Sequence, residues 1–299
     1  MMTTTPHAVV RDTRSRGPEP LVKGRHAFRW SNVPLHAVLI VLSALMAVPF
    51  VWMLLASFKP LEEIFQVPPS LLPQNWTTRN YDTAFAQVDF VRAFTNSVVV
   101  AVAVTVLSLL TCAMAAYAFA RIRFRGRGVL FTAFLGTMMV PQQLTIIPLY
   151  VIMGELGLLD TLWSLILPAG LFNAFGVFLL RQYVKSIPVE LEEAAAIDGA
   201  GRIRVFATIV LPLLRTPMVA LGIFIFLAQW NSFFYPLIFL NSSENFTLPL
   251  VVNQFKGALT SDWGALMAGV TIAAVPMLLV FMIAQRQIVE GIALSGSKT

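Results

Sequence analysis

Long stretches without a charged residue divide the chain into six hydrophobic runs. Each run reaches or exceeds the ~20 residues that a helix needs to cross ~30 Å of hydrocarbon. Inside a bilayer every backbone N–H and C=O must be satisfied without water, so the runs are predicted to be helices and not strands. The pattern predicts an all-α membrane protein with six transmembrane helices, in the runs Trp30–Phe58, Ala93–Ala120, Gly128–Gly154, Thr161–Leu180, Thr216–Ser243 and Trp263–Gln285.

Composition supports a membrane protein. Of the 299 residues, 57% are hydrophobic and 12% are charged, whereas an ordinary soluble domain carries about 25% charged residues. The net charge of +6 comes from basic residues that lie between the hydrophobic runs. Such a distribution is a topology signal and not a binding patch, so nucleic acid is not expected as a partner.

The distribution of lysine and arginine predicts how the chain is oriented. Seventeen of these residues fall before the first run, in alternate loops or in the C-terminal tail, and four, Lys59, Arg79, Arg92 and Lys256, fall on the opposite side. The positive-inside rule then places both termini in the cytoplasm. We expect a basic tail over residues 1–34, a membrane domain over 35–290, a C-terminal tail over 291–299, and external loops at 59–92 and 244–262.

Several kinds of chemistry are disfavoured by what the chain lacks. The GxxxxGK[ST] phosphate-binding loop is absent, so an ATP site of that type is not expected. The three histidines, His7, His26 and His36, are not spaced as metal ligands. The six runs contain no charged side chain that could relay protons. We therefore expect no catalytic residue, metal or cofactor on this chain, and energy for uphill transport would have to enter from a partner through a loop.

One cytoplasmic loop, residues 185–215, begins with the pattern of a short helix. Ser186 and Pro188 suit a helix start, and glutamates in the early turns complement the helix dipole. Alanines then favour the helix with little side-chain bulk. Asp198-Gly199 is a turn signal, because glycine accepts the left-handed conformation that ends many helices. The acidic and alanine positions are Glu190, Glu192, Glu193, Ala194, Ala195 and Ala196.

A second helical stretch follows in the same loop. Ile203, Phe206, Ile209 and Leu213 recur at three- and four-residue steps, and Pro212 is expected to stop or kink the helix. The pattern alone leaves two interpretations open. The loop is either an amphipathic connector lying on the membrane or an acidic, alanine-lined projection that another protein contacts.

The same loop resembles the cytoplasmic signature of binding-protein-dependent ABC importer permeases. That signature reads EAA, three residues, Gly, nine residues, Ile, one residue, Leu-Pro. All seven positions match here over twenty residues, and the neighbouring Glu192 and Asp198 are similar to the sugar-importer branch. The matching residues are Glu193, Ala194, Ala195, Gly199, Ile209, Leu211 and Pro212.

Three other segments resemble the six-span subunit of maltose-type sugar permeases. They are Trp230-Asn231-Ser232-Phe233 with Pro236-Leu237, Asp262-Trp263-Gly264, and the ending Gln285 to Gly296, although Lys298-Thr299 departs from the usual ending. The resemblance covers roughly residues 35–296.

The resemblance implies a permease core whose first loop helix is a coupling helix seated in a separate ATPase subunit. Glu193 would then meet a basic group on the ATPase, and Gly199 would permit the turn. The implied partners are a second permease subunit in a heterodimer, an ABC ATPase dimer that holds ATP and Mg, an extracytoplasmic solute-binding protein, a sugar and the lipids of a bacterial plasma membrane.

A candidate substrate path lies in the fifth run. Gln229, Asn231 and Tyr235 surround Trp230, and amides can hydrogen-bond sugar hydroxyls while an indole face stacks on a pyranose ring. The alternative is helix–helix packing, in which interhelical amide bonds contribute ~0.6 kcal/mol. Other polar residues within the runs are Asn96, Gln142, Gln143 and Asn173.

Rival interpretations of function remain open at this point. The same machinery could carry glycerol phosphate, a peptide or an anion. A partner-independent channel or carrier, or a membrane enzyme, is less well supported, because the runs lack charged groups and no catalytic constellation is visible. The external loop 244–262 is expected to probe the solute-binding protein, as similar loops do in the resembling family.

Overall fold

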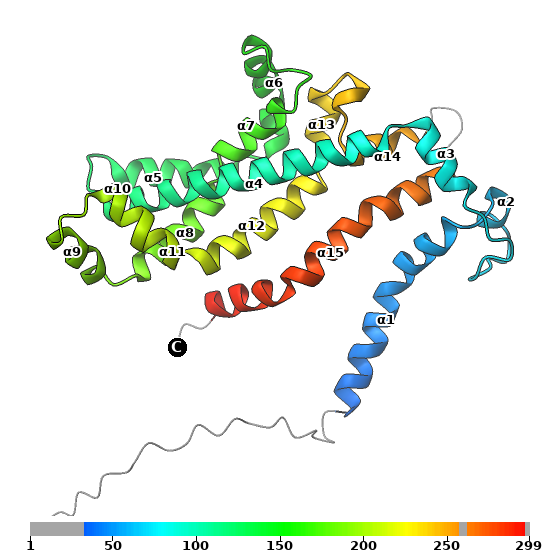
Figure 1. The fold of residues 1–299 in the computed structure, drawn as a ribbon, viewed down its shortest axis with the longest axis horizontal. Coiled ribbons are helices and arrows are strands. Elements are labelled where there is room, and N and C mark those ends of the chain that lie inside the picture. The colour runs from blue at the N-terminus through cyan, green and yellow to red at the C-terminus, as the bar shows by residue number, and fades with distance from the viewer. Residues whose placement is uncertain (1–32, 257–261, 297–299) are drawn as a thin grey trace, which may run out of the picture. The chain divides into compact units, whose positions relative to one another are not determined.

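The computed structural model describes residues 33–256 and 262–296, and every element in them is helical (Figure 1). The predicted tails fall largely outside these residues, although the last helix continues to Gly296. The helices are α1 Val33–Ala56, α2 Leu61–Ile64, α3 Arg79–Gln87, α4 Phe90–Arg121, α5 Arg127–Gly136, α6 Ile146–Glu155, α7 Trp163–Leu171, α8 Ala174–Ser186, α9 Glu190–Ile197, α10 Arg202–Val205, α11 Leu211–Leu213, α12 Arg215–Trp230, α13 Phe234–Phe239, α14 Leu248–Gln254 and α15 Trp263–Gly296.

The chain forms two compact units, residues 1–49 and 50–299. The described part of the first unit is the greater part of α1. Its side chains from Val33 to Pro49 are exposed, and none of them is Asp, Glu, Lys or Arg. A helix that is apolar on all sides belongs in a membrane or a protein interior.

Within the described residues, four helical segments are long and apolar enough to cross a membrane, and two bent helix pairs raise the number to six if each pair is one span. The first bent pair, Arg127–Met139 with Gln142–Glu155, turns by 100°. Pro141 lies in the break, where its missing N–H cannot continue a helix. The run Gly128–Gly154 is therefore not one unbroken helix, and whether the bent pair crosses as a single span stays a prediction.

The predicted fifth span, Thr216–Ser243, is also interrupted. Helix α12 ends at Trp230, and α13 begins at Phe234 after a break of three residues. The second bent pair instead joins Arg202–Leu213 to α12 at an angle of 74°. Hydrophobicity measures the length of a run but contains no information on where the helix breaks.

Helix α4 is central to the second unit, where it packs against α7, α8 and α12. Small residues allow the close approach: a Cβ at Gly170 would lie 2.6 Å from Leu107, and one at Gly176 would lie 2.7 Å from the Cys112 sulfur. Small residues are typical of helix contacts within membranes because dispersion and short polar contacts stabilise the pairing. Cys112 is buried in this core.

Candidate functional site

The loop between α8 and α12 folds into the two expected helices. Helix α9 covers Glu190–Ile197, and α10 continues through a π-helical turn, Phe206–Val210, into α11. Ser186 closes α8 instead of starting α9, since its hydroxyl donates to the Tyr183 carbonyl at 2.8 Å. These elements lie together at one end of the second unit (Figure 1).

Gly199 makes the turn between the two helices. Its φ of +81° is in the left-handed region. That conformation is strained for a residue with a Cβ but not for glycine. The N–H of Ala200 donates to the Ala195 carbonyl at 2.9 Å, and the N–H of Gly199 donates to that of Ala196 at 3.1 Å. This is the Schellman arrangement, which satisfies the last carbonyls of α9.

An ion pair holds α9 against the end of α4. Arg121 Nε donates to Glu192 Oε1 at 2.6 Å, and the two side chains are 18% and 12% exposed. A second guanidinium nitrogen of Arg121 donates to the Ile187 carbonyl at 2.5 Å. Glu192 therefore faces the helix bundle, and its carboxylate connects α9 to the long central helix.

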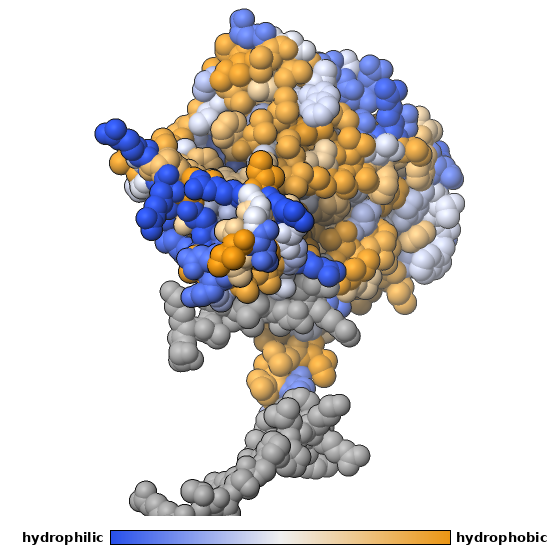
Figure 2. All heavy atoms as spheres, turned by 60° about the vertical axis from the view of Figure 1, so that its left-hand side comes forward, coloured by the Kyte–Doolittle hydropathy of each residue, from blue (hydrophilic) through white to orange (hydrophobic). Residues whose placement is uncertain are grey.

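The opposite face of α9 is open. Glu193, Ala194, Ala196 and Ile197 are exposed, Ile197 to 86%, whereas Ala195 is half-buried. Figure 2 shows hydrophilic side chains gathered at the end of the molecule that carries α9 and α10, while hydrophobic atoms cover much of the remaining visible face. An exposed helix with short alanine side chains and two carboxylates, Glu190 and Glu193, has a shape that can enter a cleft on another protein.

The second half of the signature joins the loop to α12. Val210 and Leu214 are fully buried, Ile209 and Leu211 are half-buried, and Pro212 is exposed. The 74° bend into α12 follows Leu213, which is one residue after Pro212. This packing ties the segment to α12, because the two buried residues flank the bend.

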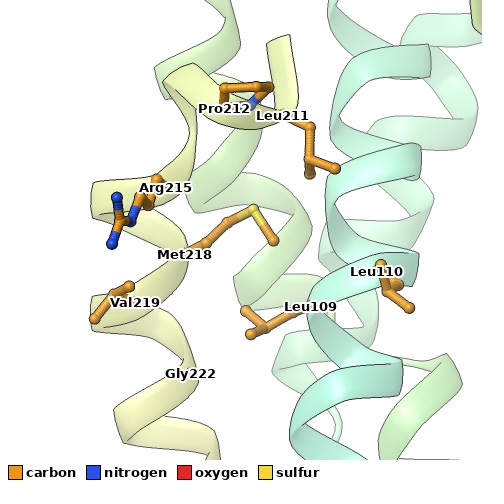
Figure 3. Close-up of a pocket in the computed structure, with 8 residues that line it drawn as sticks. All are labelled: Leu109, Leu110, Leu211, Pro212, Arg215, Met218, Val219 and Gly222. Atoms are coloured by element: carbon orange, nitrogen blue, oxygen red, sulfur yellow. The ribbon is translucent and has the colours of Figure 1, made fainter. Parts of the chain in front are cut away.

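A groove of about 440 Å³ lies beside the bend, between α4 and α12 (Figure 3). Met218 and Leu109 extend toward each other across it, and Arg215 lies at its edge on α12. Apart from Arg215 its walls are apolar, so it offers no set of hydroxyl-binding groups. The lining residues are Leu109, Leu110, Leu211, Pro212, Arg215, Met218, Val219 and Gly222.

The predicted substrate path is not supported at Trp230. This side chain is 3% exposed, its indole N–H donates to the Ala273 carbonyl at 3.2 Å, and its ring contacts Phe94 and Phe226. The ring stacks on Phe226 and meets the Phe94 ring edge to face, and the polar atom is bonded inside the fold. This environment favours the alternative of helix–helix packing, and a role of Trp230 in a substrate path stays a prediction.

The other three candidates lie around the break after α12. Asn231 is exposed and its amide donates to the Leu227 carbonyl at 2.8 Å, while Gln229 and Tyr235 are half-buried. Their role in a substrate path stays a prediction. Asn173 caps α8, because its oxygen accepts from the Gly176 N–H at 2.8 Å. Across residues 33–256 and 262–296 no group of three or more His, Cys, Asp or Glu side chains could hold a metal ion.

Comparison with known proteins decides the family. The profile described as "Binding-protein-dependent transport system inner membrane component" matches residues 113–293. The chain belongs to this permease family. It is therefore a multi-pass inner-membrane component of a transport system, and the matched residues include the whole signature loop.

Full-length relatives agree with the family match. The chain is 37% identical over 252 residues to the "Probable ABC transporter permease protein YurM" of Bacillus subtilis (strain 168), covering 84% of this chain and 83% of that protein. It is 34% identical over 263 residues to the "Lactose transport system permease protein LacG" of Rhizobium radiobacter, covering 88% of this chain and 95% of that one.

A solved structure shares the permease fold. The match to a chain of a bacterial ABC transporter involved in the import of the acidic polysaccharide alginate has a TM-score of 0.73 and 24% identity, and covers 87% of this chain and 98% of that one. At this identity the similarity concerns the fold. The helical architecture of this permease is thus the one found in an ABC importer.

Asp160, which the sequence did not single out, organises the opposite end of the permease. Its carboxylate accepts the N–H groups of Asn241 and Ser242, both at 2.9 Å, and the Ser242 hydroxyl at 2.5 Å. The Ser242 hydroxyl is the main reason that the pKa of Asp160 falls from 3.8 to about 2. Asp160 has a φ of +56°, so this turn is strained unless the contacts hold it.

A second pair of contacts holds the start of the predicted external loop 244–262. Arg92 lies 3.5 Å from the Glu244 carboxylate, and the Asn96 amide donates to the Glu244 and Phe246 carbonyls at 2.9 and 3.0 Å. Asn96 thus positions a loop instead of lining a path. Because these residues are about 150 positions apart in the sequence, no local pattern could have identified them.

Proposed function

We propose that this permease is one of two membrane subunits of an ABC importer that carries a carbohydrate into the cell, driven by a separate ATPase that binds α9. The observation that carries the proposal is the exposed face of α9, held against α4 by the Arg121–Glu192 ion pair and ended by the Gly199 turn. In this proposal both termini are cytoplasmic and ATP with Mg is bound by the ATPase dimer, not by this chain.

The connections of α9 suggest how motion would pass into the membrane. An ATPase that displaces α9 would pull on α4 through Arg121 and Glu192. The same displacement would reach α12 through Val210 and Leu214, which are fully buried beside the bend. Because packed interiors shift between discrete arrangements and do not deform gradually, a small displacement could reorient both helices together.

The carbohydrate cargo is supported by the names of relatives. Besides the lactose permease protein, they include the "Diacetylchitobiose uptake system permease protein NgcG" of Streptomyces coelicolor, which is 36% identical over 265 residues. A solute-binding protein would deliver the sugar from outside, and the second permease subunit would complete the path. The break at Asn231, with Gln229 and Tyr235, is the part of this chain that we propose lines it.

Uptake by the assembled transporter tests the proposal. Glu193→Lys should abolish coupled uptake of labelled di- and oligosaccharides and the stimulation of ATP hydrolysis, with normal insertion. Glu155→Lys, an equally exposed glutamate on α6, should leave both activities unchanged. Uptake of glycerol phosphate but no sugar would refute the cargo, and normal transport by Glu193→Lys would refute the coupling role.

A further inference from the structure

The segment between α1 and α3, residues 57–80, buries two of its four charged side chains, Lys59 and Glu63, and exposes several large apolar ones. The other two charged side chains, Glu62 and Arg79, are exposed. Lys59 is fully buried and Glu63 is 6% exposed, although lysine and glutamate are among the residue types most rarely buried. Burying a charge is costly unless it is paired and hydrogen-bonded. The segment must therefore have a defined structure in which these groups find their partners.

A compact hydrogen-bond network supplies those partners. Lys59 Nζ donates to the carbonyl and hydroxyl oxygens of Ser70, at 2.5 and 3.1 Å, and the Ser70 hydroxyl donates to Glu63 at 3.0 Å. The N–H groups of Gln74 and Asn75 donate to Glu63 at 2.7 and 3.2 Å. The Gln74 N–H is the main reason that the pKa of Glu63 is lowered, so the carboxylate stays charged.

Further contacts fix the segment at the level where membrane helices end. The Asn80 amide donates to the carbonyls of Ser57 and Lys59 at 2.9 and 2.8 Å, just after the end of α1. A Cβ at Gly264 would lie 2.3 Å from the Asn80 side-chain oxygen, so a larger residue there would displace the Asn80 amide from its present position. The segment is thus bound to the first turn of a membrane helix.

Large apolar side chains of the segment are exposed together with the polar residues Glu62, Gln66, Gln74 and Asn75. The exposed fractions of the five most exposed of these apolar side chains are 91% for Val67, 72% for Leu71, 67% for Leu72, 65% for Trp76 and 57% for Phe65. A group of exposed apolar side chains on an ordered scaffold marks an interaction surface.

We propose that this apolar surface lies in the headgroup region of the lipid bilayer and anchors the permease on the side that the charge distribution makes external. The Phe65 ring contacts the ring of Trp263 at 5.8 Å, edge to face. The surface is therefore continuous with the start of α15, one of the apolar membrane spans. Tryptophan and phenylalanine are favoured at the membrane–water boundary, where a rigid apolar surface gains burial without crossing the hydrocarbon.

A fluorescent label on Val67→Cys in the assembled transporter, reconstituted into phosphatidylcholine vesicles, tests the anchor. The only native cysteine, Cys112, is buried and would be replaced by serine in all variants. Brominated phosphatidylcholine should quench the label at position 67, and aqueous iodide should quench it weakly. The matched control is Ser243→Cys, an exposed position that carries no apolar patch, where iodide should quench strongly and brominated lipid weakly.

A second labelled variant, Leu72→Cys, should reproduce the result if Val67→Cys perturbs assembly. Strong iodide quenching at both positions would place the surface in water and overturn the proposal. Protection from both quenchers, either in the assembled membrane subunits or only after a solute-binding protein is added, would show that a protein covers it and would equally overturn it. Neither readout depends on the cargo.

Discussion

Removing the charge of Glu192 should release α9 from the bundle. In Glu192→Gln the side chain keeps its size, but the 2.6 Å contact with Arg121 Nε loses its ionic character. Both side chains are less than one-fifth exposed, so water replaces the lost interaction poorly. A hydrogen bond to a charged group contributes about 1.5–3 kcal/mol. We expect α9 to lose a local opening free energy of that order.

Amide hydrogen exchange measures this loss directly. Because about 1.4 kcal/mol corresponds to a factor of ten, the amides of α9 that exchange by local opening should exchange roughly 10 to 150 times faster. The matched control is Glu193→Gln, which removes the same charge from an exposed position one residue later. It should leave the exchange of α9 unchanged, although it should weaken coupling to the ATPase.

The outcome separates positioning from docking. If Glu192→Gln and Glu193→Gln give the same exchange rates in α9, the ion pair does not hold the helix and the reasoning fails. If only Glu192→Gln accelerates exchange and both variants lose coupled ATP hydrolysis, Glu192 positions α9 and Glu193 contacts the partner.

Three further perturbations have outcomes set by the structure. Gly199→Pro should abolish coupled uptake, because proline requires a φ near −65° and the position has +81°; Gly199→Asn, which tolerates that φ, should retain most uptake. Gly176→Val should destabilise the protein by about 1–3 kcal/mol in thermal unfolding, since a Cβ would already lie 2.7 Å from the Cys112 sulfur; an unchanged melting temperature would contradict this packing. The carboxylate of Asp160 has a folded-state pKa of about 2, below its usual 3.8, so its contribution to stability is present above about pH 4 and is lost as the pH falls toward 2. Asp160→Asn should remove that part of the pH dependence of unfolding, whereas Ser242→Ala, which deletes the main cause of the shift, should reduce it.

The coupling segment could be predicted because its determinants are local. The acidic first turn, the alanines and Gly199 each act within a few residues, and the structure forms α9 and the left-handed turn at these positions. Pro212 also acts locally, and the helix ends one residue later. Charge-free length similarly identified the apolar helices α1, α4 and α15.

The parts that could not be predicted depend on contacts between distant residues. Arg121 was counted as a topology signal, but it pairs with a glutamate 71 positions later. Trp230 and its polar neighbours are residue types typical of a sugar site. Its indole, however, is enclosed by contacts to Ala273 on α15 and Phe94 on α4. The 100° bend near Pro141 has a local cause instead, because proline has no N–H, and the length of a hydrophobic run does not show it.

Cross-linking from α9 to an ATPase tests the central claim most directly. In the assembled transporter with Cys112 replaced, a cysteine at Ile197, which is 86% exposed, should form a cross-link to the ATPase subunit that changes in yield when ATP is bound. A cysteine at Val67, which is 91% exposed, should give no such product. Absence of the Ile197 product under all nucleotide conditions, or an equal yield from Val67, would contradict the account.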